Sequence, residues 1–197
     1  IAAQGSHRLI ELRQRMNAMP PDRFPAAARQ AINTLFDHIE ALGDHISAVE
    51  RQIVEWHKSN EDSLRLASAP GVGPITASAI VAAVGDGRQF QSARHFAAWL
   101  GLTPRMHSSG KKERIGRISK GGDRYLRTLL IHGARAVVGT LFRKNLTPRP
   151  WLVALAARRP TNVAAVAVAH KTARALWAML TRAEKYRKPT AAAPIAA

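Results

Sequence analysis

The stretch that decides the fold is Leu64–Val84, LRLASAPGVGPITASAIVAAV. It reads as two helical segments on either side of a Pro-Gly-Val-Gly turn, with alanines where the helices must approach each other. This is the pattern of a helix-hairpin-helix. Gly71 and Gly73 would let the backbone come close to a nucleic-acid strand, and the N–H groups that open the second helix, near Thr76, can bind a phosphate. A plain helical hairpin would use similar glycines, so both interpretations stay open.

Helical patterns continue on both sides of this stretch, and we predict an all-α fold. The helical domain is expected to contain the helix-hairpin-helix and a short basic loop or β-hairpin inserted around residues 102–118. A long coiled-coil helix precedes it. The predicted divisions are a helical linker and dimerising coiled coil over 1–60, the main domain over 61–187 and a flexible tail over 188–197.

The long helix is predicted from about Ala26 to His57, a run without proline. Its apolar residues follow a strict 3-4 spacing, with Ile at every a position, which favours a parallel two-stranded coiled coil. The alternative is that this seam packs within the same chain. The predicted oligomerisation residues are Ile32, Leu35, Ile39, Leu42, Ile46, Val49, Ile53 and Trp56.

The formal net charge of +17 lies entirely in the second half of the chain. Residues 1–60 hold seven basic and seven acidic side chains, and residues 61–100 hold three of each. The stretch 101–127 contributes +6 and residues 143–188 contribute +10, with Arg135 adding one. Such clustering favours nucleic acid as the partner over a membrane surface or simple solubility. The basic residues predicted to contact nucleic acid in the first cluster are Arg105, Lys111, Lys112, Arg114, Arg117, Lys120, Arg124 and Arg127.

A pair of serines lies inside this basic stretch, followed at once by Gly110. A hydroxyl nucleophile surrounded by cations suits a phosphodiester substrate. Ser109 is the stronger candidate because Gly110 beside it relaxes the backbone, and Ser108 is the alternative. His107 would share a strand face with Ser109 and could accept its proton. The simpler interpretation is a hydrogen-bonding loop serine and a solvated histidine.

Several classes of protein and site are disfavoured. The chain has no cysteine, hence no disulfide framework. Its histidines lack metal-ligand spacing and no carboxylate cluster accompanies the basic stretch, so no metal site is predicted here. No apolar run approaches the roughly 18 residues of a membrane span. The chain begins at Ile1 rather than Met, and we expect it to be part of a longer protein.

Three segments carry a family resemblance: PGVGPITASAIVAAVGD from Pro70, FQSARHFAAWLGLTPRMHSSGKKERIGRISKGGDRYLRTLLIHGARAV from Phe90, and HKTARALWAML from His170. Together they resemble the carboxy-terminal domain of insertion-sequence transposases of the IS-one-ten family, most closely its IS-eleven-eleven branch. These transposases are guided by a bridge RNA and are relatives of the Piv invertase. The family is known for an amino-terminal RuvC-like domain with four acidic metal ligands, a coiled-coil linker and this serine-bearing domain.

The resemblance implies a serine recombination mechanism. The family's Ser-Gly element falls on Ser109-Gly110, so this serine would attack a DNA phosphate and hold the DNA end as a phosphoserine. Lys112, Arg114, Arg117 and Lys120 would grip the strand. One departure is Lys111, where a second glycine is expected in this branch.

The resemblance also implies partners and a cofactor. The partners would be DNA, a guide RNA and further copies of the chain, in a dimer or a tetramer. Mg²⁺ would be held by the RuvC-like domain, in an active site shared between protomers. The setting would be the bacterial cytoplasm, at the nucleoid. Two rival hypotheses are a non-catalytic helix-hairpin-helix module of a repair or junction-binding protein, and an architectural dimer that only neutralises nucleic acid.

Overall fold

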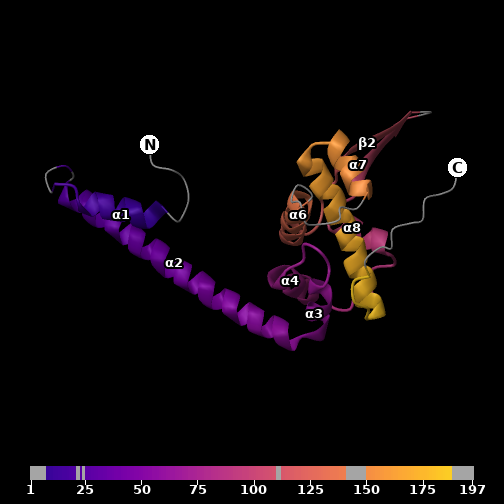
Figure 1. The fold of residues 1–197 in the computed structure, drawn as a ribbon, viewed down its shortest axis with the longest axis horizontal. Helices are drawn as coiled ribbons and strands as arrows, with labels where there is room; N and C mark the ends of the chain where they lie inside the picture. The colour runs from indigo at the N-terminus through magenta and orange to yellow at the C-terminus, as the bar shows by residue number, and fades with distance from the viewer. Residues whose placement is uncertain (1–7, 21–22, 24, 110–111, 141–149, 188–197) are drawn as a thin grey trace. The chain divides into compact units, whose positions relative to one another are not determined.

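The computed structural model describes residues 8–20, 23, 25–109, 112–140 and 150–187 (Figure 1). The predicted tail, 188–197, lies outside them. The described chain is mostly helical, which confirms the all-α prediction. It divides into two compact units, Ile1–Gln52 and Ile53–Ala197. This division falls within the long helix, whereas the predicted one lies at residue 60.

The first unit is a helical hairpin of α1 (Leu9–Asn17) and the amino-terminal part of α2 (Ala26–Ser59). Pro20 follows α1 and Pro25 precedes α2, and proline disfavours the continuation of either helix past these positions. The guanidinium of Arg13 on α1 donates to Asp37, at 2.7 Å, and to Glu40, at 3.2 Å, both on α2. Met16 and Phe36 are the buried apolar residues of this unit.

The predicted heptad seam is exposed along most of α2. Leu35 is 61% exposed and Ile46 59%, while Ile32 and Ile53 are half-buried. In the first unit α1 covers Phe36 and leaves the seam open, so packing against the first helix does not account for the seam. Pairing with a second copy stays a prediction. The exposed members of the seam are Leu35, Ile39, Leu42, Ile46, Val49 and Trp56.

The second unit is built around α8 (Thr161–Arg182), the long orange and yellow helix of Figure 1. It contacts α3 (Glu61–Ala67), α5 (Ala93–Trp99), α6 (Arg124–Gly139) and α7 (Pro150–Arg158), while α4 (Pro74–Val84) packs on α3 and α6. Burial of apolar side chains drives this packing. The largest fully buried apolar side chains are Leu66, Ile80, Phe96, Leu100, Leu102, Leu126, Leu130, Val138 and Leu176.

A two-stranded antiparallel sheet forms the predicted insertion. Strand β1 (Pro104–Ser109) pairs with β2 (Lys112–Ile118), and in Figure 1 the hairpin extends away from the helices. The insertion is therefore a β-hairpin and not an irregular loop. Pro104 pairs with Ile118 at its base, and Ser109 pairs with Lys112 at its far end. The register shifts between Pro104 and Met106.

Among the described residues, no helix has both the length and the hydropathy needed to cross a membrane.

Candidate nucleic-acid interface

The β-hairpin is tied to the helical core at its base. The amide of Ser119 donates to the carbonyl of Thr103 at 2.9 Å, and that of Lys120 to the carbonyl of Gly101 at 3.1 Å. Gly101 has a φ of +70°, and a Cβ there would overlap the backbone of Gly121, so this position requires glycine. Backbone hydrogen bonds therefore hold the base of the hairpin, and at Gly101 the neighbouring main chain leaves no room for a side chain.

The helix that follows the hairpin begins at a defined cap. The carboxylate of Asp123 accepts from the amide of Leu126 at 2.8 Å, as an N-cap does. This cap fixes where the chain leaves the hairpin and enters α6. It also engages the carboxylate of Asp123, three residues after Lys120, in a hydrogen bond to the backbone.

The side chain of Arg127 is buried, whereas its predicted contact with nucleic acid requires an exposed side chain. It is 9% exposed, and its Nη1 donates to the carbonyls of Leu100 and Gly121, each at 3.0 Å. A third carbonyl, that of Asp123, lies at 3.4 Å. The guanidinium joins α5, the base of the hairpin and α6 from within. We therefore correct the prediction: Arg127 stabilises the fold and does not present its charge to a phosphate.

Both candidate nucleophiles lie on β1, at the end farthest from the helical core. Cα positions pair Ser109 with Lys112, Ser108 with Glu113 and His107 with Arg114. Ser109 is the last residue of the strand, directly before the connection of residues 110–111. These backbone positions put Ser109 opposite a basic residue, Ser108 opposite an acidic one and His107 opposite a basic one.

The predicted phosphate contacts divide into three groups. Arg105, Arg117, Lys120 and Arg124 are exposed at the base of the hairpin and the start of α6. Lys112 and Arg114 belong to β2, of which the structure describes the backbone there. Lys111 lies outside the described residues. The basic residues available for a surface contact therefore concentrate on one hairpin and on the helix that follows it.

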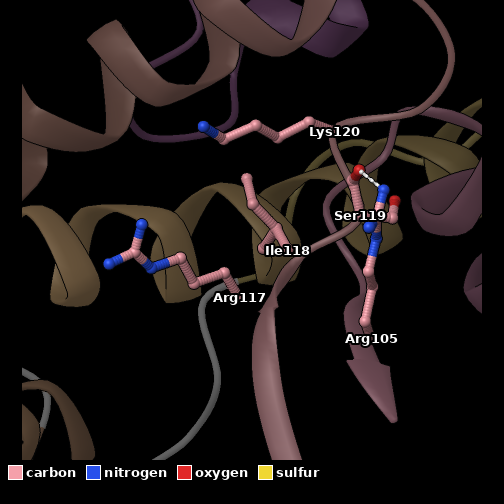
Figure 2. A pocket seen from close by; sticks show the side chains of 5 residues that line it. All are labelled: Arg105, Arg117, Ile118, Ser119 and Lys120. Carbon is pink, nitrogen blue, oxygen red and sulfur yellow. Dashed lines mark hydrogen bonds between the residues drawn. The ribbon is translucent and has the colours of Figure 1, made fainter. Parts of the chain in front are cut away.

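A hollow of about 340 Å³ opens at the base of the hairpin. Its lining residues are Arg105, Arg117, Ile118, Ser119 and Lys120, and none of these is acidic. Figure 2 shows the side chains of Arg117 and Lys120 extending to the same side, with Ile118 between them. Arg105 turns to Ser119, where its Nη2 donates to the carbonyl oxygen at 3.1 Å.

The predicted helix-hairpin-helix corresponds to α3, the turn over residues 68–73, and α4. The N-cap of α4 is Gly73, which receives no side-chain hydrogen bond, and Pro74 opens the helix. Gly71 faces inward: with a φ of +79°, a Cβ there would lie 2.6 Å from the carbonyl oxygen of Gly133 on α6. Thr76 is 8% exposed. Packing thus accounts for Gly71 and Thr76, and of the three predicted contacts Gly73 alone has open space beside its Cα.

A second serine–histidine pair, which the sequence did not single out, lies where α2 meets α3 and α4. The Nδ1 of His57 is 2.7 Å from Oγ of Ser63, which is 3.3 Å from Oγ of Ser78. All three side chains are at least nine-tenths buried. A polymer cannot reach them, so this network orients the helices and is not a candidate for phosphodiester chemistry.

More basic residues lie on α6 and α8, and none of them was assigned a role in binding from the sequence. Arg135 donates to the side chain of Asn162 at 3.0 Å, and Lys171 lies over the Trp151 ring, 4.1 Å from its centroid. His170 is half-buried beside Arg174, and burial together with that cation lowers the pKa of the imidazole. The signal that could have found Lys171 and Arg174 is the +10 of residues 143–188.

Within the described residues, no three His, Asp or Glu side chains come together as metal ligands. Two exposed acids of the first unit, Asp37 and Glu40, pair with Arg13. The donor set described here does not fit a catalytic Mg²⁺, which takes several oxygen ligands in octahedral geometry.

Comparison with known proteins finds similarity to transposases. Residues 63–146 match the model of the transposase IS116/IS110/IS902 family. A probable family 20 transposase of Pseudomonas aeruginosa is 47% identical over 184 residues, covering 93% of this chain and 54% of the relative. The transposase for insertion sequence element IS1111A of Coxiella burnetii is 45% identical over 163 residues, covering 81% of this chain and 44% of that protein.

A third relative is the pilin gene-inverting protein of Moraxella bovis, 39% identical over 80 residues, which are 38% of this chain and 24% of that protein. The chain spans about half the length of the two transposases. The matched region contains α4, α5, the β-hairpin and α6 entire. Residues 63–146 of this chain therefore form a domain of the transposase IS116/IS110/IS902 family.

Proposed function

We propose that this chain is the serine-bearing part of a DNA transposase or site-specific recombinase. The observation that carries the proposal is the position of Ser109 at the far end of a hairpin whose basic residues run from Lys112 to Lys120. Relatives named as transposases and as a gene-inverting protein support the same class of reaction.

In the proposed step the Oγ of Ser109 attacks a DNA phosphorus in line. A P–Oγ bond forms, the bond between phosphorus and one deoxyribose oxygen breaks, and that oxygen leaves as a hydroxyl after taking a proton. The serine proton passes to a base, for which His107, two residues back on β1, is a candidate. Attack by a hydroxyl of the partner strand then frees the serine and reseals the backbone. Cations along the hairpin would offset charge that grows on the phosphate.

The remaining components of the reaction lie outside the described residues. The proposal places Mg²⁺ on carboxylates of a RuvC-like domain in the same longer protein, and no step above depends on it. It also includes a guide RNA and a dimer joined through the α2 seam, or a tetramer, so that one protomer's serine would work beside its partner's metal. The setting would be the bacterial cytoplasm, at the nucleoid.

Serine substitutions in the full-length protein test this proposal. Ser109→Ala should abolish strand transfer while DNA binding is retained, and a covalent protein–DNA adduct should map to Ser109. Ser108→Ala tests the alternative nucleophile, and Ser47→Ala, which removes an exposed hydroxyl of α2 that is not part of the hairpin, is the matched control. Unchanged recombination in both Ser108→Ala and Ser109→Ala would leave a non-catalytic DNA-binding module as the better hypothesis.

A further inference from the structure

We propose that the hollow at the base of the hairpin is a phosphate subsite. It would bind the non-bridging oxygens of one phosphate of a nucleic-acid backbone, a different phosphate from the one that Ser109 attacks. The residues that would hold it are Arg117 and Lys120, with Arg105 at the rim. A phosphodiester is the ligand class because the lining supplies several N–H donors and positive charge on an open surface.

The first observation is that the lining holds three cations without a neutralising partner among its residues. Arg105, Arg117 and Lys120 line the hollow together with one apolar and one hydroxyl residue. Like charges placed this close repel one another, which disfavours the arrangement unless an anion joins it. The nearest acid in sequence, Asp123, already accepts from the α6 amide.

The second observation is the conformation of Lys120. Its φ is +56°, in the left-handed region that costs an L-residue free energy and that glycine adopts freely. Two glycines follow it directly, and a glycine at position 120 would also fit the turn, because glycine adopts a positive φ without strain. A residue kept in such a conformation points to a function of its side chain. Lys120 lines the hollow, and its side chain extends to the same side as that of Arg117 (Figure 2).

The third observation is that the site is preorganised. The backbone amides of Ser119 and Lys120 both donate to carbonyls of the segment that leads into β1. The Arg105 guanidinium is held by the Ser119 carbonyl, which leaves its other N–H groups for a ligand. Little conformational freedom of these backbone groups would be lost on binding, and such preorganisation favours affinity.

The subsite has a defined distance from the proposed nucleophile, and this step rests on the proposed function. From Pro104 at the base to Ser109 there are five residue steps, or about 17 Å at about 3.4 Å per step. That distance corresponds to about five base-pair steps of B-DNA at about 3.4 Å per step. The hollow would therefore grip the strand several nucleotides from the scissile phosphate and fix its direction along the hairpin.

The conformation of Lys120 allows a sharp experiment on this chain. Lys120→Gly removes the ammonium and relieves the backbone at the same time. We expect the salt dependence of binding, the log–log slope, to fall by about 0.9 on a 30-base-pair duplex, with affinity lowered about fivefold near 0.15 M salt. The thermal unfolding midpoint should stay equal or rise. Arg117→Gln should lower the slope by a similar amount, and the double variant by no more than about 0.9, because both side chains contact the same phosphate.

The matched control is Ala183→Gly. Ala183 is the other described non-glycine residue with a positive φ, +55°, and it ends α8. This variant relieves the same backbone conformation without removing a charge, so its unfolding midpoint should rise and its binding slope should not change. Lys120→Asn, which also tolerates the left-handed region, repeats the test if Lys120→Gly alters the fold.

Two probes distinguish the source of the phosphate. The same titrations on a DNA duplex and on an RNA hairpin of equal stem length show which backbone responds more strongly to Lys120→Gly. Unchanged slopes for Lys120→Gly and Arg117→Gln on both probes would overturn the proposal. Because binding is measured without strand transfer, and can be repeated in a Ser109→Ala background, failure here is distinct from failure of the serine mechanism.

Discussion

Gly71 and Gly133 meet backbone to backbone, where the turn between α3 and α4 lies on α6. A Cβ on Gly71 would be 2.6 Å from the carbonyl oxygen of Gly133, and one on Gly133 would overlap the carbonyl oxygen of Gly71. Real Cβ atoms do not approach backbone this closely. The glycines that first suggested a nucleic-acid contact thus include one whose inner face is covered by a neighbouring helix.

Gly133→Ala should destabilise the second unit by about 2–4 kcal/mol, because two backbones must separate to admit one methyl group. Denaturant unfolding of Gly133→Ala and of a control variant measures this loss. Gly43→Ala is the matched control: this glycine is inside α2 with nothing within 4 Å of its added Cβ among the described atoms. That substitution should stabilise the chain by about 1 kcal/mol. Equal effects at both positions would mean that the contact between the turn and α6 does not exist.

Much of the fold followed from local chemistry visible in the sequence. Pro20 marks the end of α1, Asp123 caps α6, and the break of helical pattern around residues 102–118 became the β-hairpin. These features depend on neighbouring residues alone. Structure of this kind is decided within a few positions of the chain.

The features that could not be predicted from the sequence depend on residues far apart in the chain. Arg127 lies in a run of basic residues, and only the carbonyl of Leu100, 27 residues earlier, shows that its guanidinium is directed inward. The burial of Thr76 and the contact between Gly71 and Gly133 are of the same kind. The hollow could not be predicted either, because it depends on the pairing of two strands and on the backbone conformation of Lys120.

Arg124 and Arg127, three residues apart on α6, should respond in opposite ways to the same substitution. Arg127→Met leaves the carbonyls of Leu100 and Gly121 without their donor, and we expect a loss of about 2–4 kcal/mol in unfolding free energy. Arg124→Met removes an exposed charge, so stability should change by less than about 0.5 kcal/mol. Its binding slope on duplex DNA should instead fall by about 0.9.

Denaturant unfolding and a salt titration of both variants check this pair. If Arg127→Met keeps its stability and loses binding like Arg124→Met, the guanidinium does act on the ligand, and its hydrogen bonds to the fold are dispensable.

The exposed seam of α2 should hold two copies of the chain together. Ile39→Asp and Ile46→Asp each place a charge at an a position, where a partner helix would bury it, so we expect dissociation to monomers in sedimentation velocity. Ala41→Asp is the control, because it adds the same charge to the exposed side of α2 between these positions. Its sedimentation should match that of the parent. A dimer that survives both isoleucine variants would require another surface.

His170 should make the second unit less stable in mild acid. Burial, and secondarily the charge of Arg174, lower the pKa of this imidazole in the folded chain below its ordinary value near 6.5. The unfolded chain therefore binds a proton more readily than the folded one. Stability from this group is fully present above about pH 6.5 and is lost as the pH falls from there through the lowered pKa.

Thermal unfolding followed from pH 8 to pH 5 measures this loss. His170→Gln should flatten the fall in midpoint below about pH 6.5, because the titrating group is gone. Arg174→Gln should flatten it partly, since it removes the smaller cause and leaves the burial that is the larger one. A pH profile that is the same in the parent and in His170→Gln would show that His170 takes up its proton as easily in the folded chain as in the unfolded one.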